Sequence, residues 1–238
     1  MFLPKSLYIL FAFIYAPVGG LVPVPPWKDS RIHILGNHGL LGRIHAYMAM
    51  PITRLIDNVA YSGKDVRALL HSAGKDTVDL GCGIGLSTPP GAIGVDCSIE
   101  MLRVGKFLHP SVKFDLGLAE RWGKLDMCSV AICSFLLHEQ TEQRRSKILQ
   151  NAYRIARDYV LVMDIDPVYE PSAHMLAGEP FVLEYLSNID NQIRTLFPMY
   201  TRMEIIPGHV ILWNITKIHN NTLTSLKQIE NNFLRFGT

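Results

Sequence analysis

The stretch from Val78 to Gly85, Val-Asp-Leu-Gly-Cys-Gly-Ile-Gly, constrains the fold of this chain more than any other. A short apolar run that contains one acid, Asp79, leads directly into glycines at every second position, beginning at Gly81 and Gly83. This pattern predicts a buried strand that ends in a tight turn, where missing Cβ atoms let the backbone approach a ligand. The stretch favours a nucleotide-like cofactor, although a glycine-rich turn without a ligand also fits these eight residues.

The spacing of the glycines excludes two common phosphate-binding motifs. The dinucleotide fingerprint needs Gly-x-Gly-x-x-Gly, but its last position falls on Leu86 or Thr88. A P-loop is excluded because no Gly-Lys-Ser/Thr sequence follows the turn. The remaining pattern, Asp-x-Gly-x-Gly-x-Gly, resembles the first motif of the class I S-adenosylmethionine-dependent methyltransferases.

The segments after the turn alternate between expected strands and helices, which is typical of a parallel α/β sheet. Strands are expected over 77–80, 92–96, 112–115, 127–135 and 159–164, and helices over 99–108 and 141–157. Residues 202–206 and 210–217 predict a final hairpin through Pro207 and Gly208. By the resemblance, the fold is α/β, a doubly wound seven-stranded mostly parallel sheet with an antiparallel last strand. Only the segment 86–91 precedes the second strand, so at most one helical turn fits there.

The chain divides into four predicted regions. Residues 1–27 carry Lys5 and then an uncharged apolar run, the layout of a secretory signal peptide, and predict a leader for the secretory route or a plastid. If the leader is not functional, the chain is expected to be cytoplasmic, and no stable membrane span is expected after its removal. Residues 28–75 predict an N-terminal helical cap, 76–217 the Rossmann-like methyltransferase domain and 218–238 a polar tail.

Within the cap, helices are expected in two places. One begins after a loop and runs to Tyr61, and the other covers Val66 to Gly74 behind a capping signal at Ser62 and Asp65.

Composition and cysteine spacing narrow the classes of partner and metal site that this chain can have. The 238 residues, 48% of them apolar, can bury one good-sized core, and a net charge of +2 without a basic stripe does not indicate nucleic acid. The cysteines show no metal-ligand spacing, so they are predicted to be buried thiols and no metal site is expected. These cysteines are Cys82, Cys97, Cys128 and Cys133. The oligomeric state is not indicated.

The residues just after each strand should meet at one edge of such a sheet, where ligands bind. The second strand ends at Asp96, and the run through Cys97 and Ser98 to Met101 resembles the second methyltransferase motif, whose acid binds the ribose hydroxyls. A carboxylate suits that task because its two oxygens can accept from both hydroxyls. Asp96 could instead cap the next helix, although Ser98 is available for that task. By the same resemblance, Asp79 lies near the methionine end of the cofactor.

After the third strand, Gly117-Leu118-Ala119-Glu120 resembles a Gly-Asp-Ala-Glu motif, with Leu118 in place of the acid that meets adenine. Tyr61 is a further candidate because the short first helix leaves the methionine carboxylate to the turn and the cap. The cofactor, S-adenosyl-L-methionine, is therefore expected to contact Tyr61, Asp79, Gly81, Cys82, Gly83, Gly85, Asp96, Cys97, Met101, Leu118, Ala119, Glu120 and Ser134.

The fourth strand is followed by His138 and Glu139. Many small-molecule O-methyltransferases of the resembled family place a His-acid pair here, with the histidine taking a proton from the attacking hydroxyl. An unperturbed imidazole is largely neutral at physiological pH and suits this task, so His138 is the catalytic candidate, with packing or cofactor contact as the alternative. Residues 166–180, which follow Asp164, are expected to be a loop that either lines the substrate or forms a surface turn.

These observations favour an S-adenosylmethionine-dependent methyltransferase acting on a small molecule, at a hydroxyl or similar nucleophile. The alternative is a non-catalytic protein of the same fold that binds a partner, in which the short first helix and Leu118 mark a lost site. A protein substrate is a third possibility that the sequence does not test.

Overall fold

The structure is a computed structural model and describes residues 39–218. The predicted leader, the first part of the cap and residues 219–238 lie outside the described residues, so their predictions are not tested. Among the described residues, no helix combines the length and the apolar character needed to cross a membrane.

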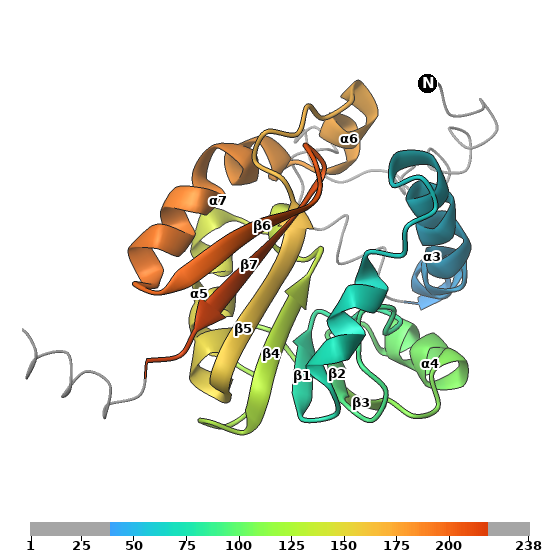
Figure 1. The fold of residues 1–238 in the computed structure, drawn as a ribbon. Coiled ribbons are helices and arrows are strands. Elements are labelled where there is room, and N and C mark those ends of the chain that lie inside the picture. Colours follow the sequence, from blue (N-terminus) through green and yellow to red (C-terminus); the bar gives the residue numbers. More distant parts are fainter. Residues whose placement is uncertain (1–38, 219–238) are drawn as a thin grey trace, which may run out of the picture.

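A seven-stranded sheet with the order β3-β2-β1-β4-β5-β7-β6 forms the centre of the molecule (Figure 1). Strands β1 to β5 run parallel, whereas β7 is antiparallel to both of its neighbours, β5 and β6. The predicted sheet, with its antiparallel last strand, is confirmed. The strands are β1 (Thr77–Leu80), β2 (Ile93–Asp96), β3 (Lys113–Leu116), β4 (Cys128–Ser134), β5 (Ala156–Ile165), β6 (Tyr200–Ile206) and β7 (Val210–Thr216).

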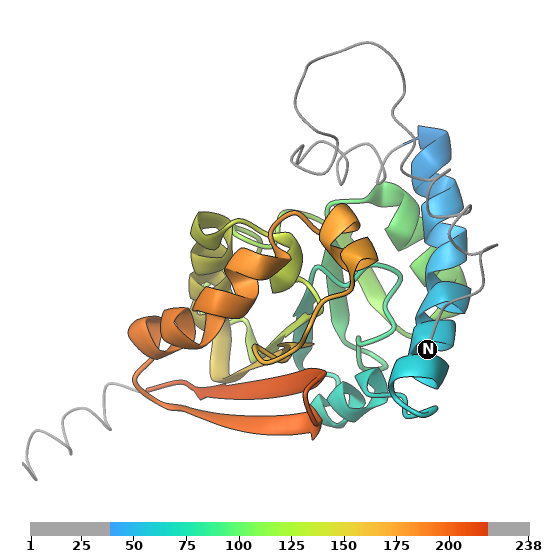
Figure 2. The ribbon, with the colours of Figure 1, turned by 90° about the horizontal axis from the view of Figure 1, so that it is seen from above.

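Helices lie on both sides of this sheet (Figure 2). They are α3 (Gly39–Ala60), the 3-10 helix η2 (Arg67–Ala73), α4 (Ile99–Leu108), the 3-10 turn η3 (Leu137–Glu139), α5 (Glu142–Ile155), α6 (Ala173–Gly178) and α7 (Val182–Leu196). Alternate residues of β4 face opposite clusters, because side chains of a strand point to alternate faces. Ala131 and Cys133 pack with α5 and α7, whereas Val130 and Ile132 pack with Leu70 of η2.

Several predicted boundaries are wrong. The helix expected to end at Arg157 ends at Ile155, because the backbone from Ala156 onward pairs with β4. The segment 166–180, expected to be a loop, contains α6, and the long helix α7 was not predicted. The spacing of the buried Val182, Tyr185, Ile189 and Ile193 in α7 is helical, so the signal was present.

The cap also differs from the prediction in detail. A single helix, α3, runs through Pro51 up to Ala60. Val66 is the N-cap of η2 and makes no side-chain capping bond, while the Asp65 carboxylate accepts from the backbone N of Ala68 at 3.1 Å. Ser62 has a φ of 53° in the turn before it. Gly74 ends η2 as predicted.

A buried arginine joins α5 to α7 and to the chain after η3. Arg145 is fully buried, and its guanidinium donates to the Gln192 side chain at 3.1 Å and to the carbonyl of Gln140 at 2.6 Å. It also lies 3.4 Å from the Glu184 carboxylate. Since a buried charge is tolerated only when it is paired and hydrogen-bonded, these bonds hold the segment after β4 in one position.

Helix α4 approaches the glycine turn closely because Gly105 has no side chain. A Cβ atom there would lie 2.8 Å from the carbonyl oxygen of Ile84 and 2.8 Å from the Phe114 ring. We expect Gly105→Ala to lower the free energy of unfolding by about 1–3 kcal/mol through overpacking, although alanine favours a helix by about 1 kcal/mol. Urea unfolding measures this change.

The control is Lys106→Ala on the exposed face of the same helix, which we expect to change stability by less than about 0.5 kcal/mol. A Gly105→Ala protein as stable as the wild type would contradict the close approach.

Candidate functional site

The glycine turn is fixed to the neighbouring strand by its own backbone. The backbone N–H groups of Gly81 and Cys82 both donate to the carbonyl of Val95, at 2.8 and 3.0 Å. Gly83 has a φ of 55°, and a Cβ atom built on it would meet nothing within 4 Å among the described residues. The turn therefore holds a rigid backbone at the ends of β1 and β2 and leaves space above Gly83.

Asp96 supports this turn from the end of β2. Its carboxylate accepts from the backbone N of Gly83 at 2.8 Å and from that of Ser98 at 2.8 Å. Ser98, and not Asp96, caps α4, because its hydroxyl accepts from the backbone N of Met101 at 3.3 Å. Burial raises the Asp96 pKa against the lowering effect of these N–H donors. A carboxylate has about four acceptor positions, so these donors leave room for a hydroxyl of a ligand.

Asp79 is a buried acid with one unmatched oxygen. Its carboxylate is fully buried, and one oxygen accepts from the Thr88 hydroxyl at 2.7 Å. The other, Oδ1, has no hydrogen-bond partner among the described residues. Burial raises the Asp79 pKa to about 7. A buried acceptor without a donor is costly, and a cationic group of a ligand would remove that cost.

The loop that replaces the first helix reaches back to the strand ends. Residues 86–91, where at most one helical turn was expected, contain no helix. The buried Ser87 donates from its hydroxyl to that of Ser134 at 2.8 Å, while Thr88 contacts Asp79. Sequence reasoning selected Ser134 but missed Ser87 and Thr88, although both hydroxyls follow the glycines directly.

Four other predicted cofactor residues lie after β3 and in α4. Leu118, Ala119 and Glu120 are half-buried after β3, and the Glu120 carboxylate lies 3.5 Å from Arg144. Met101 is buried next to Ile84 of the turn.

Two further predicted residues, Cys97 and Tyr61, differ in their exposure. Cys97 is exposed, so the prediction that all the cysteines are buried is wrong for the residue that leaves β2. Tyr61 is buried with Val66 and Leu70 on the η2 side of the sheet, and its contact with the cofactor stays a prediction.

His138 lies at the ends of β4 and β5 and is held by a fully buried acid. Its Nδ1 is 2.6 Å from Asp164, whose other oxygen accepts from the backbone N of Leu137 at 2.8 Å. Phe135, which leads into this turn, has a φ of 50°, an uncommon value that often accompanies functional sites. Asp164 and Asp166 are both fully buried, so the surface-turn interpretation is wrong for these acids.

Two glutamates lie close to His138. One ring nitrogen of His138 and one carboxylate oxygen from each of Glu139 and Glu179 all lie within 4.8 Å of one another. Burial lowers the His138 pKa, but Asp164, Glu139 and Glu179 outweigh burial and raise it to about 9. The neutral imidazole that the general-base hypothesis needs is therefore a minor form at neutral pH in the ligand-free protein. Sequence reasoning missed Glu179, which lies far from His138 in the chain.

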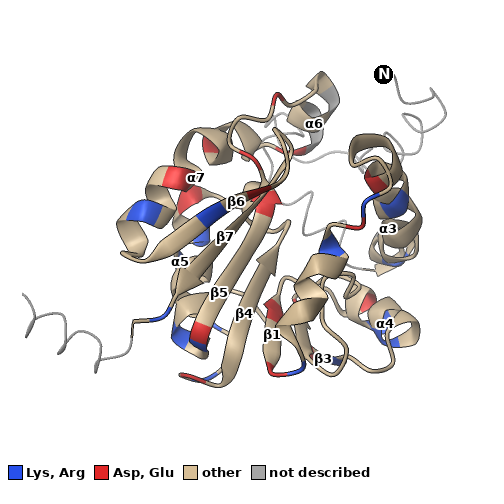
Figure 3. Ribbon diagram, viewed as in Figure 1, with Lys and Arg blue, Asp and Glu red and all other residues tan. Residues whose placement is uncertain are grey.

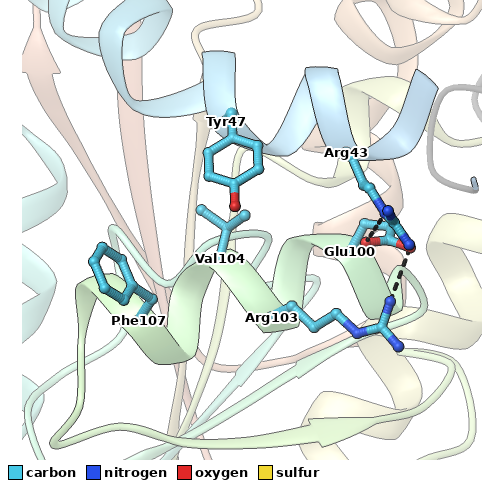
Figure 4. Close-up of a pocket in the computed structure, with 6 residues that line it drawn as sticks. All are labelled: Arg43, Tyr47, Glu100, Arg103, Val104 and Phe107. Carbon is cyan, nitrogen blue, oxygen red and sulfur yellow. Dashed lines mark hydrogen bonds and ion pairs between the residues drawn. The ribbon is translucent and has the colours of Figure 1, made fainter. Parts of the chain in front are cut away.

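A hollow of about 540 Å³ lies between α3 and α4 (Figure 4). Its lining includes Glu100, which is paired with Arg43 at 3.4 Å and Arg103 at 3.1 Å, and the exposed rings of Tyr47 and Phe107. None of the predicted site residues lines this hollow, so the chemistry is better sought at the strand ends.

Solved structures of S-adenosylmethionine-dependent methyltransferases have this fold. One from Thermotoga maritima is 15% identical, covers 74% of this chain and 100% of its own, and has a TM-score of 0.52. A TehB-like one from Corynebacterium glutamicum is 16% identical, with coverages of 74% and 99% and a TM-score of 0.50. A Methanococcus maripaludis protein provisionally assigned to the same class is 11% identical, with coverages of 75% and 94% and a TM-score of 0.51.

At these identities the likeness establishes the fold, which is that of the class I methyltransferases. No protein-family model matches the chain, and no curated protein matches its sequence.

The buried acid Asp79 predicts a pH-dependent stability. Its folded pKa of about 7 lies above the unfolded value, so the folded state alone holds a proton between about pH 4 and pH 7, and stability falls as pH rises through that range. We expect Asp79→Asn to raise the free energy of unfolding by about 1–3 kcal/mol at about pH 8 and to have little effect at about pH 5. Urea unfolding at both pH values measures this.

Asp115→Asn on the exposed strand β3 is the control, and we expect it to change stability by less than about 0.5 kcal/mol. An Asp79→Asn effect of equal size at both pH values would show that burial of the charge is not the cause.

Proposed function

We propose that this protein is an S-adenosylmethionine-dependent methyltransferase that acts on a small molecule, at a hydroxyl or similar nucleophile. The observation that carries the proposal is the fully buried Asp79 oxygen at the foot of the glycine turn, for which no described residue supplies a hydrogen bond. An ammonium group such as that of the cofactor's methionine end fits this oxygen. When bound, the cofactor supplies an electrophilic methyl group on a sulfonium.

Three parts of the chain would hold the cofactor. The turn around Gly83 offers open backbone, and the Asp96 carboxylate would accept from the ribose. Leu118 offers adenine an apolar contact in place of the acid common in the family. In this arrangement Asp79 would bind the methionine end of the cofactor and Asp96 its central ribose.

The substrate would lie beside these residues, over the ends of β4 and β5. His138, Glu139 and Glu179 gather there, and His138 is the residue proposed to act on the nucleophile. The chain would hold the nucleophile in line with the methyl group and exclude water, which are the main contributions that a protein makes to such a displacement. A small molecule is proposed because the polar groups here are largely withdrawn from the surface.

The proposal is tested by the affinity for S-adenosylhomocysteine in calorimetry. We expect the wild type to bind and Asp96→Asn to weaken binding at least tenfold, since the amide offers fewer acceptor positions. Asp115→Asn, on the next strand, is the matched control and should bind as the wild type does. Thermal unfolding of each variant separates lost binding from lost folding.

Failure of the folded wild type to bind would reject the proposal and favour the alternative, a non-catalytic protein of this fold. The absence of the first helix and the presence of Leu118 are the observations that favour this alternative.

The same measurement as a function of pH tests Asp79. The ammonium group binds the ionised carboxylate, whose pKa is about 7, so we expect affinity to fall as pH decreases through about 7. In Asp79→Asn this dependence should disappear together with most of the affinity. An unchanged pH dependence in the variant would place the titrating group elsewhere.

The size of the substrate is tested by methyl transfer from labelled cofactor into a cell extract separated by mass. We expect label in the low-mass fraction. Label in the protein fraction alone would indicate a protein substrate.

A further inference from the structure

The ends of β4 and β5 carry a set of possible metal ligands that the proposal above does not assign to the cofactor. His138 and Glu139 are neighbours in η3, and Glu179 ends α6, so two separate segments meet here. Their donor atoms lie within 4.8 Å of one another, close enough for one ion to contact all three. Figure 3 shows that acidic residues also occupy the upper end of β5 and the segment that follows it.

His138 is oriented as an imidazole that binds a metal. Its Nδ1 lies 2.6 Å from Asp164, and Asp164 is itself fixed by the backbone N of Ile165 at 2.8 Å and by that of Leu137. Histidines that bind metals almost always donate their other ring N–H to such a carboxylate or carbonyl, which fixes the ring and raises the basicity of the free nitrogen. The bond to Asp164 therefore leaves Nε2 for a ligand.

The surroundings of this set favour a cation. Among the described residues, the carboxylates of Glu179, Asp164 and Asp96 raise the pKa of Glu139, while His138 lowers it. Asp164 likewise raises the pKa of Glu179, while His138 lowers it. Acids brought together away from water repel one another, and a divalent cation compensates this repulsion more fully than one proton does.

We propose that His138, through the ring nitrogen that Asp164 does not take, binds a divalent transition-metal ion together with Glu139 and Glu179. One nitrogen and two carboxylate ligands suit Mn²⁺ or Zn²⁺ better than Mg²⁺, which prefers oxygen alone. Three protein ligands leave a position open for a substrate oxygen. A hydroxyl bound there would lose its proton to solvent more readily, which would give His138 its part in the reaction.

This inference deepens the proposed function by naming a metal at its substrate side, and it departs from the expectation that the chain needs none. The ion site itself rests on the three side chains and on Asp164, so it is measured without cofactor or substrate.

The test is calorimetry of the full chain, treated with a chelator and then titrated with MnCl₂ or ZnCl₂. We expect one ion per chain, and at least tenfold weaker binding in Glu139→Gln and Glu179→Gln. Glu170→Gln is the matched control, since Glu170 is exposed in the same segment as Glu179, and it should bind as the wild type does. Pulsed electron paramagnetic resonance of bound Mn²⁺ should show coupling to an imidazole nitrogen that is lost in His138→Gln.

The outcomes separate the site from adventitious binding and from the proposed function. Absence of binding by the wild type, or equal binding by both glutamine variants, would overturn the inference, the second by placing the ion on exposed groups. Circular dichroism and thermal unfolding of the metal-free variants show whether they are folded. Metal binding without S-adenosylhomocysteine binding would reject the methyltransferase and keep the ion site, and the reverse result would reject the ion site alone.

Discussion

The parallel register of β1, β2, β4 and β5 is the constraint on which the rest of the structure depends. Because these strands run the same way, their carboxyl ends meet at one edge, where Asp79, Asp96 and Asp164 lie at or just before the strand ends. Backbone hydrogen bonds connect the end of one strand to the next, as where the glycine turn after β1 donates to the Val95 carbonyl of β2. Acids far apart in the chain thus share one site. Their burial is unfavourable, and the packing of the apolar sheet core offsets it.

Two kinds of buried acid occur at this edge. Asp164 accepts from the imidazole and from backbone N–H groups, so its charge is compensated within the fold and it serves as an anchor for the turn after β4. Within residues 39–218, Asp79 accepts from the Thr88 hydroxyl alone, and its other oxygen has no donor. The difference separates a structural acid from one that fits a ligand, although both are fully buried.

Much of the sheet was predictable because its signals are local. The strand at 77–80 and the helix at 99–108 were predicted with the bounds that the structure has. The start of β5 was not, since residues 156 and 157 were assigned to the helix before them, whereas pairing with β4 takes their backbone. For α7 the periodicity was present but not used. The exposure of Cys97 could not be inferred from the sequence. Cysteine is usually buried, but here the direction in which the chain leaves β2 decides whether the side chain is exposed.

The sequence alone determined the fold class, the glycine turn and the pair Asp79 and Asp96, because glycine spacing and an acid at a strand end express backbone geometry directly. Tertiary structure decided which acids have donors and which residues join His138. Glu179 reaches it only because α6 folds back over the sheet edge, and Thr88 covers Asp79 only because a loop replaces the first helix. Such contacts depend on how separate segments pack, which no short stretch of sequence encodes.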